Sequence, residues 1–476
     1  MDNNFVRHAS IVVGMIFVLS WLACEVNAAP FEQWNRTFGG VAEDWANSVQ
    51  QTSDGGYVIA GQLKSLSRDI RLPGNIDASI IKTDGNGSVQ WERTFGNPFD
   101  DDKANYIQET RDRGYILAGS TSAIGYGAGS DIDAWLIKTD MNGSQMWKKT
   151  FPGEKDAIAN AVKQTTDGGY VIAGKYSYGT DISSAFIIKT DDNGTQIWSK
   201  TFGEINEAKS VWQTMDGGYI LAGFRRLSLD AWNTQTDASL IKVDINGDKQ
   251  WSKEFGGKKD DIINSVQQTS DKGYVMAGNT RSSGEGGSDA WLIRINDKGD
   301  GQWRKTFGGT GDDSINSVLE TRDEGFILAG STDLYGTGKT DALFIKTDKN
   351  GTQQWSKILG GKDSDWVLSA QETSEEEFIL AGVTYSYGNG SADSWLIKVS
   401  GESMPNQKAI PISSPTPIFT PEYTPRSTTA NPQTAPPLAT TIPAYTPKIS
   451  GFDPIYAIAE MLAIAFILRR NKVRYK

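Results

Sequence analysis

The chain has 476 residues, a formal net charge of -11 and a sequence pI near 4.9. This acidic balance leaves no basic stripe to neutralise phosphates, which argues against a nucleic-acid partner. The single Cys and the single His are Cys24 and His8. A chain that loses its first 29 residues therefore has no disulfide, no Ser–His triad and no Cys- or His-based zinc site.

Residues 1–29 have the pattern of a secretory signal peptide. A short basic start and an apolar run over residues 11–22 precede Val26-Asn27-Ala28, which is a small-residue cleavage pattern. We expect export, with cleavage after Ala28 or Ala29. Lipidation at Cys24 is the alternative, although the residues before it fit a lipobox poorly.

One string recurs seven times along the chain that follows. TSDGGYVIAG (52–61) returns as TTDGGYVIAG (165–174) and TMDGGYILAG (214–223), and four looser copies are present. A Trp before an Arg/Lys-Thr-Phe-Gly string recurs with the same period of roughly 52 residues. These tryptophans, which we expect to pack between repeats, are Trp34, Trp91, Trp147, Trp198, Trp251, Trp303 and Trp355.

Each repeat resolves into four short strands, called A, B, C and D. In the first repeat we expect A at 47–52, B at 56–61, C at 78–84 and D at 90–96. Asp-Gly-Gly and Asp-Gly-Asn-Gly supply hairpin turns between A and B and between C and D. Seven such units predict an all-β fold, a seven-bladed β-propeller of four-stranded blades.

The two ends of the repeat region predict how the ring closes. The region enters on a D strand (33–38) and leaves on a C strand (395–400). The seventh unit therefore lacks a D strand and the first has a spare one. We expect the N-terminal D strand to pair with the C-terminal A, B and C strands, which removes the exposed sheet edges.

The motifs resemble two kinds of known repeat. D-x-N-G-x-x-x-W, as in DGNGSVQW, looks like the turn and Trp of quinoprotein-type (PQQ-like) propeller repeats. The whole unit, over residues 31–400, is similar to the tandem propeller repeats of archaeal cell-surface proteins, notably methanogen ones. The resemblance implies a propeller at the cell surface. Seven units rather than eight, and no Cys pair, argue against a bound quinone.

The composition changes abruptly after the propeller. We expect a signal peptide at 1–29, the propeller at 30–400, a Pro/Thr/Ser-rich, disordered stalk at 401–449 and a short hydrophobic helix within 450–476. Basic residues follow that helix, which places the propeller on the outer side of the membrane. The tail resembles the PGF-CTERM sorting signal of archaea, which implies cleavage and lipid anchoring. A retained membrane anchor is the alternative.

We expect the variable B–C loops to form the binding face, because loops that vary on a repeated frame commonly bind ligands. Their non-recurrent aromatic residues are candidates for stacking on a sugar or peptide. These are Tyr126, Tyr176, Tyr178, Trp232, Tyr335, Tyr385 and Tyr387.

Acidic residues recur just before the A strands and are expected to gather on the same face. They are candidates for a carboxylate rim that binds Ca²⁺, or for turn-forming groups that bond nearby N–H groups; their recurrence favours the second role. The candidates are Asp44, Asp102, Asp156, Asp261, Asp313 and Asp365. Six sequons are candidate glycosylation sites: Asn35, Asn86, Asn142, Asn193, Asn350 and Asn389.

The leading functional hypothesis is a non-enzymatic, membrane-anchored protein of the cell surface. It would serve in adhesion or binding, or as a structural part of the envelope. Its partners would be envelope components, glycans or surface proteins. A secreted carbohydrate-active enzyme or polysaccharide-binding protein is the alternative, and would need a carboxylate pair that breaks the sevenfold pattern. A quinone- or metal-dependent oxidoreductase is a third hypothesis.

Overall fold

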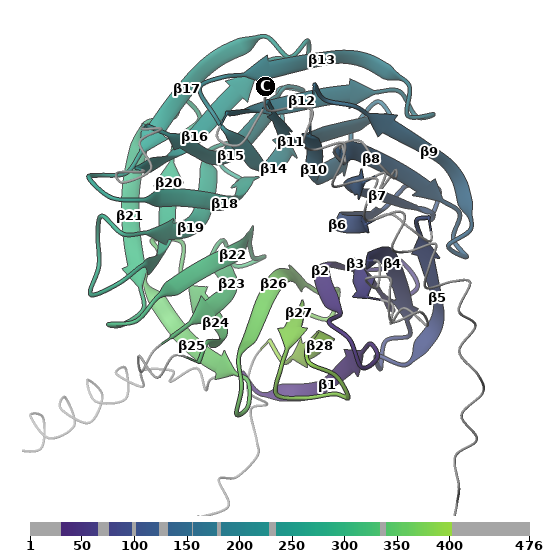
Figure 1. Cartoon of the computed structure of the whole chain (residues 1–476). Helices are drawn as coiled ribbons and strands as arrows, with labels where there is room; N and C mark the ends of the chain where they lie inside the picture. Colours follow the sequence, from purple (N-terminus) through teal and green to yellow (C-terminus); the bar gives the residue numbers. More distant parts are fainter. Residues whose placement is uncertain are drawn as a thin grey trace, which may run out of the picture. The chain divides into compact units, whose positions relative to one another are not determined.

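Twenty-eight short antiparallel strands make up the described part of the chain, arranged as seven sheets around a central opening (Figure 1). The structure is a computed structural model that describes residues 30–64, 76–97, 101–122, 132–154, 156–178, 182–227, 235–333 and 339–401. Within these residues no helix is long and apolar enough to cross a membrane. The predicted signal peptide, stalk and C-terminal helix lie outside the described residues.

The first four blades follow the chain in order, each with its A strand innermost and its D strand outermost. Blade 1 contains β2 (Trp45–Gln51), β3 (Tyr57–Lys64), β4 (Ile76–Thr83) and β5 (Val89–Phe95). Blade 2 contains β6 (Asp101–Glu109), β7 (Tyr115–Ser122), β8 (Ile132–Thr139) and β9 (Gln145–Phe151). Blade 3 contains β10 (Asp156–Gln164), β11 (Tyr170–Ser177), β12 (Ser183–Thr190) and β13 (Gln196–Phe202). Blade 4 contains β14 (Glu207–Gln213), β15 (Tyr219–Arg226), β16 (Thr236–Val243) and β17 (Lys249–Phe255).

The last three blades complete the ring. Blade 5 contains β18 (Asp261–Gln268), β19 (Tyr274–Thr280), β20 (Asp289–Ile295) and β21 (Gly301–Phe307). Blade 6 contains β22 (Asp313–Glu320), β23 (Phe326–Thr332), β24 (Asp341–Thr347) and β25 (Gln353–Leu359). Blade 7 contains β26 (Asp365–Glu372), β27 (Phe378–Thr384), β28 (Asp393–Val399) and β1 (Glu32–Phe38). The predicted seven-bladed propeller is confirmed.

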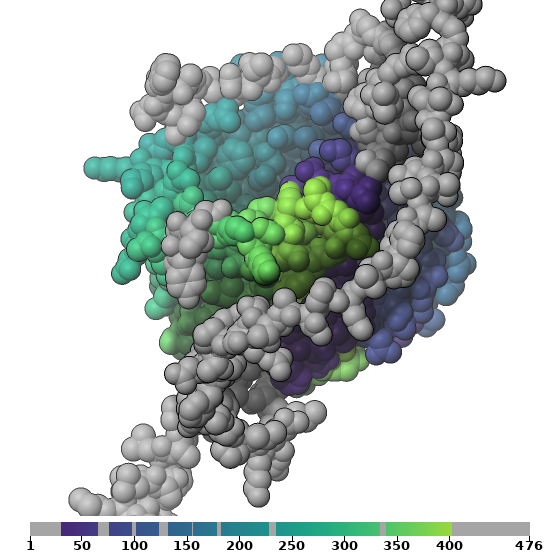
Figure 2. All heavy atoms as spheres, turned by 60° about the horizontal axis from the view of Figure 1, so that its bottom comes forward, coloured from purple at the N-terminus to yellow at the C-terminus, as the bar shows by residue number. Residues whose placement is uncertain are grey.

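Ring closure takes the predicted form. β1 pairs antiparallel with β28, with Asn35 opposite Ile397, so the first described strand supplies the D strand of the last blade. The purple N-terminal and yellow-green C-terminal segments accordingly lie side by side (Figure 2). The pairing covers the edge of β28 and makes β1 the outer strand of blade 7, as in the other six four-stranded blades.

The B and C strands are buried on both faces because every blade packs between two others. On β8, Trp135 and Ile137 pack against residues of blade 1, whereas Ala134 and Leu136 pack against residues of blade 3. The alternating pattern therefore serves two interfaces, and one apolar cluster forms at each blade junction.

The recurrent D-strand tryptophans pack across blade junctions. Trp147 of blade 2 lies 5.9 Å from Tyr170 of blade 3, measured between ring centroids, and the other six tryptophans make the same contact with Tyr or Phe. The D-x-N-G turn is part of this contact. Gly143 has a φ of +77°, and a Cβ there would lie 2.6 Å from the Trp91 ring. Only glycine allows the turn to sit on the neighbouring indole.

Candidate functional site

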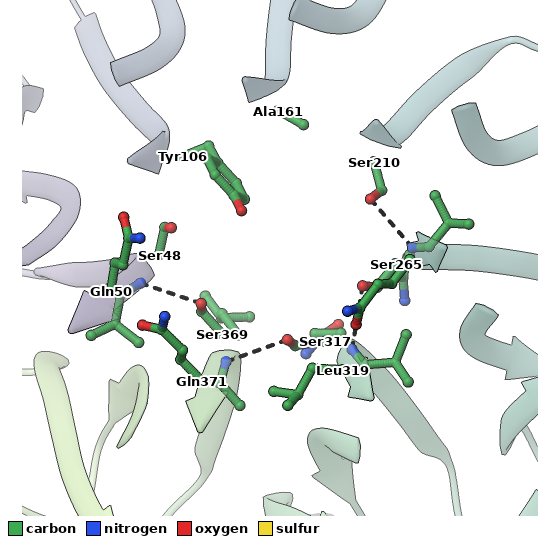
Figure 3. A pocket seen from close by; sticks show the side chains of 18 of the residues that line it. Ser48, Gln50, Tyr106, Ala161, Ser210, Ser265, Ser317, Leu319, Ser369 and Gln371 are labelled. Carbon is green, nitrogen blue, oxygen red and sulfur yellow. Dashed lines mark hydrogen bonds between the residues drawn. The ribbon is translucent and has the colours of Figure 1, made fainter. Parts of the chain in front are cut away.

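The seven A strands surround a cavity of about 530 Å³ at the centre of the ring (Figure 3). Its lining comes from all seven blades, from β2, β6, β10, β14, β18, β22 and β26. Every A strand contains a one-residue β-bulge, between Ala46 and Ser48 in blade 1. A bulge redirects the side chain of the extra residue, here toward the next blade.

The bulged residue is an asparagine in five blades and bonds the next blade. Asn47 Nδ2 donates to Ala104 O at 2.9 Å, and the other four asparagines repeat this bond. The A strand is the inner edge of its sheet, so alternate backbone groups have no strand partner. The asparagines supply part of what those edges lack.

Serine follows the bulge in five blades and acts as an acceptor. Ser48 Oγ accepts the N–H of Ile107 in the next blade at 3.3 Å, and Ser210, Ser265, Ser317 and Ser369 make the equivalent bonds. Figure 3 shows these serines around the cavity. The serines therefore satisfy one outward N–H of each following A strand.

Two positions after the serine position, four blades have a glutamine that also accepts an N–H of the next A strand. Gln50 Oε1 accepts the N–H of Glu109 at 2.6 Å, and Gln108, Gln267 and Gln371 make the equivalent bonds. Most polar side chains of the channel wall thus join one blade to the next. Their recurrence marks a structural role.

The pattern breaks in consecutive blades on one side of the cavity. Tyr106 in blade 2 and Ala161 in blade 3 replace the serine, Lys163 in blade 3 and Trp212 in blade 4 replace the glutamine, and Lys209 replaces the asparagine. Outside these blades, the breaks in this wall are Leu319 and Leu368. We call Tyr106, Lys163, Lys209 and Trp212 the channel cluster.

Lys163 lies between the two aromatic rings of the channel cluster. Its ammonium is 4.8 Å from the centroid of the Tyr106 ring and 4.6 Å from that of Trp212, and it donates a hydrogen bond to the Tyr106 hydroxyl. Figure 3 shows Tyr106 extending into the cavity. Such cation–π contacts hold an ammonium in place without neutralising its charge.

Lys209 differs from Lys163 because its charge is paired. Its ammonium lies 2.9 Å from Glu207, which is buried and also lies 3.1 Å from the Lys175 ammonium. Burial alone would raise the pKa of Glu207, but the two lysines outweigh it and hold that pKa below its usual value. Glu207 is therefore an ionised structural carboxylate and is poorly suited to act as a general acid.

The predicted stacking residues are not brought together. Tyr176 packs on Phe186 at 4.5 Å, Tyr385 on Trp366 at 5.4 Å, and Tyr387 on Trp395 at 5.8 Å, all between ring centroids. The Tyr387 hydroxyl also donates to Gly360 O at 2.7 Å, and Tyr178 is 37% exposed. Tyr126, Trp232 and Tyr335 lie outside the described residues.

The predicted metal ligands accept hydrogen bonds from the chain around them. Asp261 accepts from Gly257 N–H at 2.9 Å and from the hydroxyls of Thr280 and Ser282. The same kind of bond, from N–H groups beside the blade junction, reaches Asp44, Asp102, Asp156, Asp313 and Asp365. Among the described residues, no group of three or more acidic, His or Cys side chains could hold a metal ion. Calcium binding stays a prediction.

A second aspartate approaches the first at five junctions. Burial, followed by the nearby Asp261 carboxylate, raises the pKa of Asp237. Asp77, Asp289, Asp341 and Asp393 have raised pKa values for the same two reasons. Carboxyl pairs of this kind are what a glycosidase requires, but a pair repeated around the ring points to structure.

The candidate glycosylation sites occupy three settings. The amide nitrogen of Asn35 on β1 donates to Glu32 at 2.5 Å. Asn389 is exposed in the segment before β28. The remaining four, Asn86, Asn142, Asn193 and Asn350, are exposed in turns between C and D strands, where their N–H groups bond the preceding Asp.

Sequence reasoning missed the channel cluster. It assigned binding to the B–C loops and passed over the A strands as repetitive. The signal was present in the aligned repeats, where Tyr, Lys and Trp stand at positions that other repeats give to Ser or Gln. A residue that departs from a repeat at an inward position is the one to examine.

Comparisons with known proteins find solved structures of similar fold but no family to which the chain could be assigned. No protein-family model and no curated protein matches the chain. Among solved structures, the Pan2 WD40 domain of Neurospora crassa covers 78% of this chain and 98% of its own, at 12% identity and a TM-score of 0.46. A polysaccharide lyase described as an ulvan lyase of family PL25 covers 77% and 96%, at 12% identity and a TM-score of 0.46. Sqt1 from Chaetomium thermophilum covers 74% and 83%, at 12% identity and a TM-score of 0.43.

Proposed function

We propose that this protein is a non-catalytic recognition module of the cell surface that binds a small ligand in its central cavity. The observation that carries the proposal is the channel cluster. Most other polar positions of the wall bond a backbone group of the next blade. Tyr106, Lys163 and Trp212 replace those side chains on one side and contact one another instead. Side chains that give up a repeated structural bond at a cavity wall are candidates for ligand contact.

The cavity has the size of a small-molecule site. Its volume of about 530 Å³ falls within the range of roughly 300–1,000 Å³ that is typical for such sites. Asn, Ser and Gln side chains dominate the wall, so a polar ligand suits it better than an apolar one. This location replaces the B–C loops as the proposed binding site.

The cellular location is proposed from the sequence. The signal-peptide pattern of residues 1–29, the Pro/Thr/Ser-rich segment and the basic C-terminal tail support an exported, anchored protein. Protease treatment of intact cells tests the location. Loss of the propeller without cell lysis supports it, and full protection argues for an internal protein.

A binding screen tests the recognition role. The full chain would be screened against glycans and envelope extracts, and each hit retested with Trp212→Gln and Leu319→Gln. Both variants introduce the glutamine that four other blades carry. We expect Trp212→Gln to abolish binding and Leu319→Gln, across the cavity, to leave it unchanged.

Two results would count against the proposal. Hits that bind both variants equally well would place recognition outside the cavity. Turnover of a glycan by the purified chain would favour the carbohydrate-active enzyme over a binding module.

A further inference from the structure

The channel cluster leaves a set of hydrogen-bond donors without side-chain acceptors. In blades 1, 5 and 7 a Ser and a Gln accept two outward N–H groups of the following A strand. Tyr106, Ala161, Lys163 and Trp212 offer no such acceptor. The affected N–H groups are those of Val162, Val211, Gln213 and Gln268, and no side chain of the described residues accepts any of them.

Lys163 adds an uncompensated charge beside these donors. Three cations line the cavity. Lys209 pairs with Glu207 at 2.9 Å and Arg322 with Glu376 at 3.3 Å, while in the described part of the chain Lys163 forms no ion pair. An ammonium has three N–H bonds, and the Tyr106 hydroxyl accepts one. The other two have no hydrogen-bond acceptor in the described part of the chain.

Charge differs between the two sides of the cavity. Next to blades 2 and 3, a second hollow of about 380 Å³ is lined by Arg111, Arg113 and Glu109, so its cations outnumber its carboxylate. On the side of blades 6 and 7, Glu320, Glu372 and Arg322 line the cavity itself, and the Arg322 guanidinium is paired with Glu376. An anion is therefore drawn toward Lys163 and repelled from the opposite wall.

We propose that the cavity wall of blades 2 to 4 binds the carboxylate of a small polyhydroxylated anion, such as a sugar acid. Lys163 supplies the charge, and Val211, which also lines the cavity, supplies a neutral N–H donor that no described side chain accepts. The Asn, Ser and Gln side chains around the cavity face the hydroxyl groups. This inference rests on the proposed recognition function and names the chemistry of its ligand.

Three probes separate the parts of this proposal. Titration calorimetry on the full chain would use galacturonate, galactose and inorganic phosphate. Galactose matches galacturonate but lacks the carboxylate, and phosphate has the charge without the sugar. We expect saturable binding of galacturonate, at least tenfold weaker binding of galactose, and weaker binding of phosphate.

Variants that restore the repeat make the test specific. Lys163→Gln removes the charge and supplies an acceptor for the Gln213 N–H, so the fold should keep or raise its Tm. We expect it to weaken galacturonate binding at least tenfold. Leu319→Gln makes the same kind of change across the cavity and should leave binding unchanged. Lys163→Arg, which keeps the charge, should retain part of the affinity.

Each contrary result is distinct. Equal binding of galactose and galacturonate would overturn the role of the carboxylate, while phosphate binding as tight as galacturonate would overturn the role of the hydroxyl groups. Absence of galacturonate binding, or binding unaffected by Lys163→Gln, would overturn the whole inference. The recognition role itself would still stand if a ligand from the screen were lost in Trp212→Gln.

Discussion

The indole of Trp34 lies 5.9 Å from the phenol ring of Tyr57, between ring centroids and at an interplanar angle of 60°. Trp34 is on β1 in blade 7, and Tyr57 is on β3 in blade 1. This pair is one of seven equivalent contacts, and it spans the junction at which the two ends of the propeller meet.

Removing the Trp34 indole should lower stability as much as removing the equivalent tryptophan at another blade junction. We expect Trp34→Ala and Trp198→Ala each to lower the free energy of unfolding by about 2 kcal/mol, since both lose a half-buried aromatic contact. Urea denaturation followed by circular dichroism measures both. A harmless Trp34→Ala beside a costly Trp198→Ala would show that β1 contributes little to blade 7.

Buried cations of the C strands predict a pH dependence. The Lys82 ammonium lies 2.9 Å from Asp54 in the A–B turn. Burial acts to raise the pKa of Asp54, but hydrogen bonds from Thr52, Lys82 and Gly56 lower it to about 2. A carboxyl with a lowered folded-state pKa stabilises the fold above its unfolded pKa, and that stabilisation is lost as pH falls through the folded value.

Asp54→Asn tests this dependence. At pH 7 we expect it to cost about 1 kcal/mol, because Asp54 is itself more than half exposed. The difference from the unaltered protein should shrink as pH falls from about 4 to 2. Glu324→Gln is the control, because Glu324 and Lys349 are both exposed and such pairs contribute little. A pH-independent cost of Asp54→Asn would contradict the assigned role of the carboxylate.

Glycine before the blade junction should be required where its φ is positive and an aspartate faces it. Gly256 has a φ of +153°, and a Cβ there would lie 2.6 Å from Asp261 Oδ2. Gly203 occupies the same place in its repeat but has no positive φ, and a Cβ there would have nothing within 4 Å. We expect Gly256→Ala to cost about 2 kcal/mol and Gly203→Ala less than about 0.5 kcal/mol. Thermal unfolding of the two variants measures these costs. Equal losses of stability would contradict the role given to Asp261.

Leu319 offers a way to stabilise the ring. In four blades a Gln at this position accepts the N–H of the next A strand, as Gln267 does for Glu320 at 2.9 Å. Leu319→Gln should supply the same bond to the Glu372 N–H and raise the free energy of unfolding by about 0.5–1 kcal/mol. Ser265→Ala, which removes an existing bond of this kind, should lower it by a similar amount. A destabilised Leu319→Gln would mean that the leucine contributes more by apolar packing.

Much of the fold could be predicted from the repeated strings. Strand type, turn position and blade count follow from local patterns such as Asp-Gly-Gly before Tyr57, because hairpin turns and period-two alternation are local properties. Most strand ends of the first repeat differed by one or two residues, as in the first C strand, Ile76–Thr83. The first B strand, Tyr57–Lys64, ends three residues later than predicted. Ring closure was also predictable, since an unpaired D strand and an incomplete blade complement each other.

The candidate site could not be predicted in the same way. Lys163 and Trp212 are 49 positions apart in the sequence and belong to different blades, so no local pattern connects them. Their meeting depends on the ring, which brings the A strands of successive blades to one wall. Aromatic residues of the B–C loops drew attention because they vary, yet Tyr385 and Tyr387 pack on neighbouring tryptophans.

The sequence by itself determined the elements and their number, because each repeat carries its own turns, strands and packing residues. Only the tertiary structure decided which departures from the repeat lie together. Closing seven blades into a ring turns equivalent positions of distant repeats into neighbours around one cavity. At that cavity, Lys163 lies between the rings of Tyr106 and Trp212 and forms no ion pair with the described residues.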